Sequence, residues 1–177
     1  VKAKLSYQDF LLRLLEQQAL TKIDTSINNT IKRAGFPVIK RMEEFDFAFQ
    51  PQMDEKLIRE LATLHFMNEA KNIVLLGPPG VGKTHLAISI GIKACQERKQ
   101  VLFYTAENLV QEMAAAEISG AINKILLKLI KADLLIIDEL GYIELPPKAN
   151  RLFFNIISKR YEKGSVIITS NKPFEEW

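Results

Sequence analysis

A short apolar stretch that leads straight into a glycine-rich loop limits the possible folds of this chain more than any other feature. Residues 73–76 are Ile-Val-Leu-Leu, and residues 77–84 are Gly-Pro-Pro-Gly-Val-Gly-Lys-Thr. Glycines at this spacing let the backbone turn tightly and point its N–H groups at phosphate oxygens. A helix that begins at the end of the loop adds the positive end of its dipole. The pattern therefore predicts a nucleoside triphosphate site between a buried strand and a helix.

The loop residues have distinct expected tasks. Lys83 is suited to reach the β- and γ-phosphates, and the Thr84 hydroxyl is suited to ligate Mg²⁺. His85 lies in the first turn of the helix and is a further candidate for a phosphate-side contact, with a packed or solvent-facing histidine as the alternative. Neither His85 nor His65 has companions at metal-ligand spacing, so a zinc site is unsupported. The expected ATP contacts are Gly77, Pro78, Pro79, Gly80, Val81, Gly82, Lys83, Thr84 and His85.

An acidic pair follows a second apolar strand. Residues 134–137 are Leu-Leu-Ile-Ile, and Asp138 and Glu139 come directly after them. A carboxylate at the end of a central strand reaches Mg²⁺ on the triphosphate, usually through water, so we expect Thr84 and Asp138 to hold the metal. Glu139 is placed to polarise a water for attack on the γ-phosphate. Such an adjacent glutamate is typical of hydrolytic ATPases and separates them from most kinases.

A third apolar strand, residues 166–168, leads through Thr169 and Ser170 to Asn171. In the additional-strand subclass of phosphate-loop folds, this strand lies between the loop strand and the strand that carries the acidic pair. Asn171 would then sit beside the γ-phosphate, although its ordinary role as a strand-end turn former is the alternative. The expected catalytic residues are Lys83, Glu139 and Asn171.

Strands and helices alternate from residue 73 onward, which predicts an α/β fold with helices on both faces of a parallel sheet. We expect five strands. Phe45, Phe47 and Phe49 alternate with polar or small residues, as an edge strand or extended segment would, and their rings are candidates for core packing or for a wall beside the nucleotide base. The expected strands include 73–76, 101–105, 134–138 and 165–170, and the expected helices 83–98, 107–115, 121–131 and 148–162.

The N-terminal part has a helical pattern of its own. A capped start at Ser6 precedes apolar residues 10, 11, 14 and 15, and a second helical stretch over 23–34 ends at Gly35. A further helix is expected from Asp54 to about Met67. We predict a helical N-terminal region, 1–45, and an ATPase core, 46–177. The first residue is Val1 and the last is Trp177, so we expect a fragment of a longer protein.

The composition indicates the size of the core, the absence of a membrane span and the cellular compartment. With 177 residues, 47% of them hydrophobic, the chain can bury one good core, and no apolar stretch reaches the length of about 18 residues that a membrane span needs. The lone Cys95 is expected to be a small core residue, which fits a reducing bacterial cytoplasm. The net charge is +3, and the whole excess lies in residues 1–45, which hold eight Lys and Arg against five Asp and Glu.

Two helices carry basic side chains at helical spacing. Lys124, Lys128 and Lys131 form one stripe, and a solvated helix face is the alternative to DNA contact. The helix after the acidic pair also carries Lys148, Arg151, Lys159 and Arg160. Contact with the phosphate backbone of DNA is the hypothesis for these surfaces, with residues Lys124, Lys128, Lys148 and Arg151.

These motifs together resemble the IstB-like ATPases, the helper proteins of bacterial insertion-sequence transposition, and are similar to the DnaC-type helicase loaders. The resemblance covers most of the chain. It is carried by 33–37 (Arg-Ala-Gly-Phe-Pro), 44–47 (Glu-Phe-Asp-Phe), 75–87, 138–142 (Asp-Glu-Leu-Gly-Tyr), 158–161 (Ser-Lys-Arg-Tyr) and 169–174 (Thr-Ser-Asn-Lys-Pro-Phe). It implies an AAA+ fold of the additional-strand class, with a nucleotide site of Gly77 to Thr84, Asp138, Glu139 and Asn171.

The resemblance also implies a function. An IstB-like protein would bind ATP with Mg²⁺, form a homo-oligomer on double-stranded DNA, hydrolyse ATP and recruit or stimulate the cognate transposase. The arginine that the family supplies from a neighbouring subunit is expected beyond the Thr-Ser-Asn strand, outside this chain, and Arg160 is a candidate substitute. The alternatives are a DnaC-like helicase loader, a small-molecule kinase, for which an arginine-rich lid is lacking, and a binding module with negligible turnover.

Overall fold

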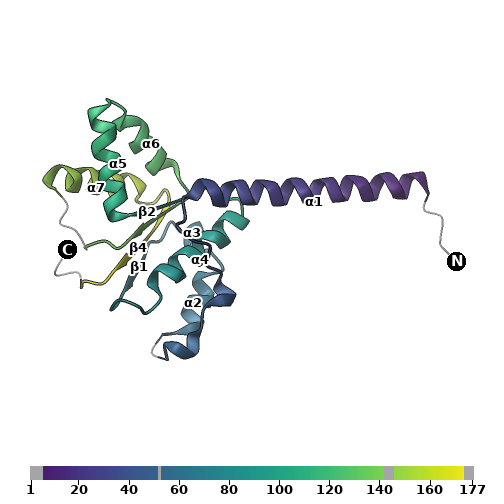
Figure 1. Cartoon of the computed structure of the whole chain (residues 1–177), viewed down its shortest axis with the longest axis horizontal. Coiled ribbons are helices and arrows are strands. Elements are labelled where there is room, and N and C mark those ends of the chain that lie inside the picture. The colour runs from purple at the N-terminus through teal and green to yellow at the C-terminus, as the bar shows by residue number, and fades with distance from the viewer. Residues whose placement is uncertain (1–5, 52, 142–145, 174–177) are drawn as a thin grey trace.

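The computed structural model describes residues 6–51, 53–141 and 146–173 of the chain. Helices cover both faces of a central sheet, and one long helix, α1, projects away from it (Figure 1). The helices are α1 (Tyr7–Ala34), α2 (Glu55–Leu61), α3 (His65–Asn68), α4 (Lys83–Gln96), α5 (Ala106–Ile118), α6 (Ile122–Lys131) and α7 (Pro147–Arg160), and two 3₁₀ turns are η1 (Met42–Glu44) and η2 (Phe47–Phe49). The predicted α/β class is confirmed.

The strands of the sheet run parallel and are not in chain order. Their order is β1 (Ile73–Leu76), β4 (Ser165–Ser170), β3 (Leu134–Asp138) and β2 (Val101–Thr105). The last strand therefore lies between the loop strand and the strand of the acidic pair, as predicted. Because the carboxyl ends of parallel strands share one edge of a sheet, the residues that follow β1, β3 and β4 meet there.

The expectation of five strands is wrong for the described residues, whose sheet has four. The segment with alternating phenylalanines forms 3₁₀ turns instead of a strand. The Asp46 carboxylate accepts a hydrogen bond from the Ala48 N–H at 2.9 Å and caps η2. The Phe45 and Phe47 rings pack edge to face with centroids 4.8 Å apart. Local capping and aromatic packing thus stabilise 3₁₀ turns in this segment. Alternating phenylalanines in the sequence do not distinguish such turns from a strand.

Alternate residues of β3 supply two hydrophobic cores, one on each face of the sheet. Leu134 and Ile136 belong to the core under α4, whereas Leu135 and Ile137 belong to the core under α5, α6 and α7. This division follows from the period of two in a strand, and all five residues of β3 are buried. Burying an apolar side chain of this size contributes about 1.5–3 kcal/mol, so β3, one of the two inner strands, contributes to both cores.

The N-terminal pattern forms one helix instead of the expected two. Its predicted ends are confirmed, since a capping box joins Ser6 and Asp9 and Gly35 adopts a left-handed φ of 82°. Residues 16–22, between the two expected helices, are mostly good helix formers, so nothing interrupts the helix. Ala34 anchors its last turn in the core under α4. The proposed division of the chain at residue 45 stays a prediction.

The expected helix from Asp54 to about Met67 is broken. Leu64 has a φ of 65°, in the left-handed region, and separates α2 from α3. The side chain of Leu64 is buried in the core, so packing holds a backbone conformation that leucine rarely adopts. The start of the helix is confirmed, because the Asp54 carboxylate accepts a hydrogen bond from the Leu57 N–H at 3.1 Å.

The composition predicts that no segment spans a membrane and that Cys95 is a core residue. Within the described ranges, every helix is too short or too polar to cross a membrane. Cys95 lies on α4 and is fully buried, as predicted for a core residue. Burial raises the pKa of its thiol to about 12, so the side chain stays neutral in the core.

Arg160, at the end of α7, is an internal structural residue. Its side chain is 1% exposed. The guanidinium donates hydrogen bonds to the carbonyl oxygens of Leu129 (2.7 Å), Ala132 (2.8 Å) and Ser165 (2.7 Å). Burial lowers the pKa of Arg160 to about 10, which leaves it charged at neutral pH. The suggestion of Arg160 as a substitute for a neighbour's arginine is therefore wrong, because the guanidinium joins the end of α6 to the start of β4.

Replacing Arg160 with Met should destabilise the fold strongly. The substitution leaves several buried carbonyl oxygens without a donor, at a cost of about 3 kcal/mol or more in the free energy of unfolding. Urea denaturation followed by circular dichroism measures this cost. The exposed neighbour Lys159→Met is the matched control, with an expected change below about 0.5 kcal/mol. Equal stabilities of the two variants would contradict the assigned role of Arg160.

Candidate nucleotide-binding site

The glycine-rich loop connects the end of β1 to the start of α4, at the carboxyl edge of the sheet. The Gly77 N–H donates a hydrogen bond to the Ser170 carbonyl oxygen at 3.3 Å, which ties the start of the loop to β4. Gly80 and Gly82 have φ values of 83° and 91°. Residues with a side chain rarely adopt these angles, so the loop requires glycine at both positions. The predicted strand, loop and helix are confirmed.

Phe45 closes one side of the loop. A Cβ atom at Gly82 would clash with Cε2 of Phe45, so the aromatic ring occupies the space that a side chain would need. The same ring packs edge to face against His85, with centroids 5.2 Å apart. Phe45 is half-buried, belongs to neither hydrophobic core and packs against the loop. Gly82 is therefore constrained twice, by its backbone angle and by this contact.

Lys83 is held inside the loop. Its ammonium donates hydrogen bonds to the carbonyl oxygens of Gly77 (2.6 Å) and Pro78 (2.7 Å), and its side chain is buried. Burial lowers the pKa of Lys83, while the charges of Asp138 and Glu139 act in the opposite direction. The cation thus lies between the loop backbone and the acidic pair, where a triphosphate would supply further negative charge.

Asp138 accepts hydrogen bonds from two other elements. The Thr84 hydroxyl, on α4, donates to Oδ1 at 2.9 Å, and the Thr169 hydroxyl, on β4, donates to the same oxygen at 2.5 Å. The Thr169 oxygen in turn accepts a hydrogen bond from the Glu139 N–H at 2.9 Å. Sequence reasoning missed Thr169. Its position two residues before Asn171, at the carboxyl end of a buried strand, is the signal that could have found it.

Seven of the predicted ATP-site residues border one cleft of about 290 Å³. Glu139 is exposed and Asn171 is half-buried, so both can meet a ligand. Segments more than fifty residues apart in the sequence come together here because β4 lies between β1 and β3. The lining residues are Pro79, Gly80, Gly82, Lys83, Thr84, Glu139, Thr169 and Asn171.

The donors beside this cleft suit Mg²⁺. Thr84 offers a hydroxyl and Asp138 a carboxylate, and their oxygens lie 2.9 Å apart. Mg²⁺ prefers oxygen ligands and usually takes one or two from the protein and the rest from water and phosphate. Within the residues that the structure covers, no group of three His, Cys, Asp or Glu side chains gathers at metal-binding distance. The donor set therefore fits a metal that arrives with a triphosphate.

Two further predicted binding residues, His85 and Lys128, form hydrogen bonds within the chain. His85 Nε2 is hydrogen-bonded to the Arg41 carbonyl oxygen at 2.9 Å, so its ring faces residues 41–45. Lys128 donates to the Tyr104 hydroxyl at 2.7 Å and lies 3.5 Å from a Glu112 carboxylate oxygen. Lys128 is thus used within the chain, which makes it a weaker DNA candidate than its position in the stripe suggested.

The other DNA candidates lie on the face covered by α5, α6 and α7. Lys148 forms an ion pair with Glu117 at 2.6 Å, and this exposed pair is worth little energetically. Lys124 and Arg151 are exposed, and among the described residues neither forms an ion pair. The structure therefore leaves Lys124 and Arg151 as the more available cations.

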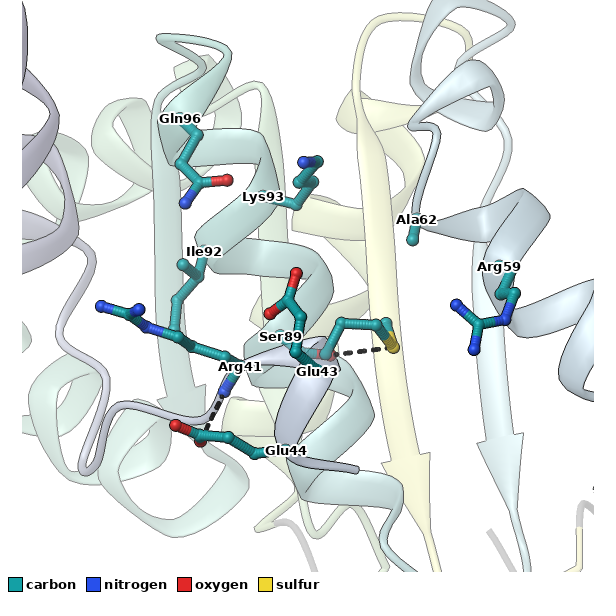
Figure 2. A pocket seen from close by; sticks show the side chains of 10 residues that line it. Arg41, Glu43, Glu44, Arg59, Ala62, Ser89, Ile92, Lys93 and Gln96 are labelled. Atoms are coloured by element: carbon teal, nitrogen blue, oxygen red, sulfur yellow. Dashed lines mark hydrogen bonds between the residues drawn. The ribbon is translucent and has the colours of Figure 1, made fainter. Parts of the chain in front are cut away.

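A larger cavity of about 530 Å³ lies elsewhere, between η1, α2 and α4 (Figure 2). Its charged lining is mixed, with arginine and lysine side chains beside Glu43 and Glu44. Glu44 accepts a hydrogen bond from the Arg41 N–H at 3.0 Å, and the Ser89 hydroxyl donates to the Leu86 carbonyl at 2.9 Å. None of the predicted phosphate or metal ligands lines it. The smaller cleft, which the predicted phosphate ligands line, is therefore the candidate nucleotide site.

Sequence similarity to known proteins extends along the whole chain. The family described as IstB-like ATP binding protein matches residues 1–177. An ATP-binding protein of insertion sequence IS5376 from Geobacillus stearothermophilus is 46% identical over 98% of this chain and 69% of that protein. An ATP-binding protein of insertion sequence IS21 from Pseudomonas aeruginosa is 42% identical over 99% of this chain and 66% of that protein. The chain thus spans about two thirds of the length of these relatives.

Solved structures share the fold. AMPPCP-bound DnaA from Aquifex aeolicus matches with a TM-score of 0.70 and 22% identity, over 78% of this chain and 43% of that one. The DnaC helicase loader matches with a TM-score of 0.59 and 26% identity, over 67% of this chain and 68% of that one. These similarities confirm the expected phosphate-loop AAA+ fold.

Replacing Gly82 with Ala should weaken nucleotide binding by about tenfold or more, because the left-handed φ alone costs about 1–2 kcal/mol. The contact with Phe45 adds to this cost. Gly80→Ala is the matched control, since its φ is similar but no atom lies within 4 Å of the added Cβ. Titration with a fluorescent ATP analogue measures both variants. If the Gly80 variant loses as much affinity as the Gly82 variant, the Phe45 contact is unimportant.

Proposed function

Because this chain belongs to the family of IstB-like ATP-binding proteins, we propose that it hydrolyses ATP and uses the nucleotide to control its assembly on duplex DNA beside a transposase. The observation that carries the proposal is the position of Glu139. This carboxylate borders the cleft that Lys83, Thr84 and Asn171 also line. A protein that only binds ATP does not need a carboxylate there.

Each residue has a defined task in the proposed hydrolysis. The loop N–H groups and Lys83 bind the phosphates, and the positive end of the α4 dipole favours their charge. Glu139 accepts a proton from a water whose oxygen attacks the γ-phosphorus, and ADP is the leaving group. Asn171 orients that water or the γ-phosphate from the end of β4. Mg²⁺, held through Thr84 and Asp138, would neutralise charge on the phosphate oxygens.

We propose that a neighbouring subunit completes this site with an arginine. Arg160 is unavailable, since its guanidinium is buried against backbone carbonyls. An arginine donated in trans raises phosphoryl-transfer rates by about 10³ to 10⁵ in other ATPases and GTPases. Hydrolysis would therefore be slow in a monomer and fast in an assembly, which makes ATP turnover a timer for assembly and release.

The DNA and transposase parts of the proposal rest on charge and on the relatives. The similar proteins are named for insertion sequences, which move by means of a transposase. Lys124 on α6 and Arg151 on α7 are exposed cations on helices that cover the same face of the sheet. Such cations bind the phosphate backbone of DNA without reading its base sequence.

A helicase loader is the second candidate, because the DnaC helicase loader shares 26% identity with this chain. A loader would prefer single-stranded DNA, whereas a transposition helper would prefer a duplex. Filter binding of the full-length protein to both forms, with a non-hydrolysable ATP analogue, separates the two. Tight duplex binding that is indifferent to nucleotide would contradict both candidates.

Replacing Glu139 with Gln should lower the rate of ATP hydrolysis by about 10² to 10⁴, because the amide is a poor base. ATP binding should persist, so assemblies on duplex DNA should become longer-lived. Phosphate release and size-exclusion chromatography measure the two effects. The exposed Glu97→Gln, at the end of α4, is the control and should match the wild-type protein. An unchanged hydrolysis rate in the Glu139 variant would exclude its role as the base.

Replacing Lys124 or Arg151 with Ala should weaken duplex binding, and each change should reduce the slope of affinity against salt concentration by about 1. Lys56→Ala, on α2, is the control. Fluorescence anisotropy at several salt concentrations measures the slopes. If only the control variant changes the slope, DNA binds another face of the molecule.

A further inference from the structure

We infer that Thr169 is a positioning residue for ATP hydrolysis, because its single hydroxyl holds both members of the acidic pair. The inference deepens the proposed function and rests on it. Thr169 is the fifth residue of β4 and is 1% exposed. Its hydroxyl acts through Asp138 and Glu139, so it needs no contact with the nucleotide.

The hydroxyl makes two hydrogen bonds of opposite direction. It donates to Asp138 Oδ1 at 2.5 Å and accepts from the Glu139 N–H at 2.9 Å. A hydroxyl has one proton and two lone pairs, so both bonds can form together. A valine in this place has nearly the same shape and makes neither bond. The arrangement is therefore specific to a hydroxyl, since shape alone does not provide it.

The bond to Glu139 supports an unfavourable backbone conformation. Glu139 has a φ of 60°, and a residue with a side chain pays about 1–2 kcal/mol for the left-handed region. The Thr169 carbonyl oxygen also accepts a hydrogen bond from the Leu140 N–H at 2.9 Å. One residue of β4 thus holds the turn after β3 from its side chain and from its backbone. This turn places the Glu139 side chain at the cleft.

The bond to Asp138 joins three elements at one atom. Oδ1 accepts hydrogen bonds from Thr169 on β4 and from Thr84 on α4. The carboxylate of β3 is therefore oriented from both sides before any metal arrives. Outer partners of this kind typically change metal affinity or activity by about 10- to 100-fold when they are removed.

The other two hydroxyls of β4 behave differently. Ser170 Oγ makes local contacts with the backbone N–H and carbonyl of Lys172. Ser165 Oγ is buried and has no hydrogen-bond partner among the described residues. Only the Thr169 side chain reaches across to the neighbouring strand. Asn171 follows two residues later, so the same strand carries the expected γ-phosphate contact and the support of the acidic pair.

The test compares Thr169→Val with Thr169→Ser in the full-length protein. The valine variant should lose about 10- to 100-fold in kcat for ATP hydrolysis, while KM changes by less than about threefold. The serine variant keeps the hydroxyl and should stay within about threefold of the wild-type kcat. Ser165→Ala is the control for a lost buried hydroxyl on the same strand and should hydrolyse ATP normally. Thermal unfolding checks that each variant is folded.

Several outcomes would overturn the inference. Equal losses of kcat in the valine and serine variants would show that the hydroxyl has no role in hydrolysis. A normal kcat in the valine variant would show the same. If the valine variant does not fold, a crystal structure of the wild-type protein with Mg²⁺ and an ATP analogue decides. A Thr169 hydroxyl turned away from the Glu139 N–H in that structure would overturn the inference. A wild-type protein that binds ATP but never hydrolyses it would instead contradict the proposed function.

Discussion

The insertion of β4 between β1 and β3 is the constraint on which the nucleotide site depends. It brings the Ser170 carbonyl to the start of the glycine-rich loop and the Thr169 hydroxyl to Asp138. Neighbouring strands lie about 4.8 Å apart, so a different strand order would separate these groups by at least one further strand. The loop, the acidic pair and Asn171 then could not border a common cleft. Hydrolysis, as proposed, is therefore a property of strand order as much as of the motifs.

The two ends of the same strands serve different purposes. At the amino ends, the buried Arg160 joins α6 to the starts of β3 and β4 through backbone carbonyls. Between the ends, β3 is buried along its whole length. At the carboxyl ends, Thr84, Asp138 and Thr169 link α4, β3 and β4 through side chains. Stability is thus concentrated away from the cleft, which lets an exposed glutamate in an unfavourable conformation persist there.

Sequence reasoning was accurate where neighbours in the chain define a residue's role. The loop of residues 77–84, the strand before Asp138 and the helix caps at Ser6 and Gly35 are local patterns, and the structure has them where expected. Sequence reasoning failed where the role of a residue depends on a partner that is distant in the sequence. The Phe45 segment packs on Gly82, and Arg160 binds carbonyls about thirty residues away, so neither role was visible in the adjacent sequence. The two partners of Thr169, Asp138 and Glu139, are likewise about thirty residues away in the sequence.

The chemistry of this chain can be read from its sequence: a phosphate loop, an acidic pair, an apolar strand that leads to Asn171, and the family to which these belong. Which of those groups come into contact depends on the folded arrangement of the strands and helices. This arrangement enclosed Arg160, engaged Lys128 with Tyr104 and Glu112, and placed the Thr169 hydroxyl between Asp138 and the Glu139 N–H. The physical reason is that hydrogen bonds depend on distances of about 3 Å, and only strand order and packing set such distances between remote residues.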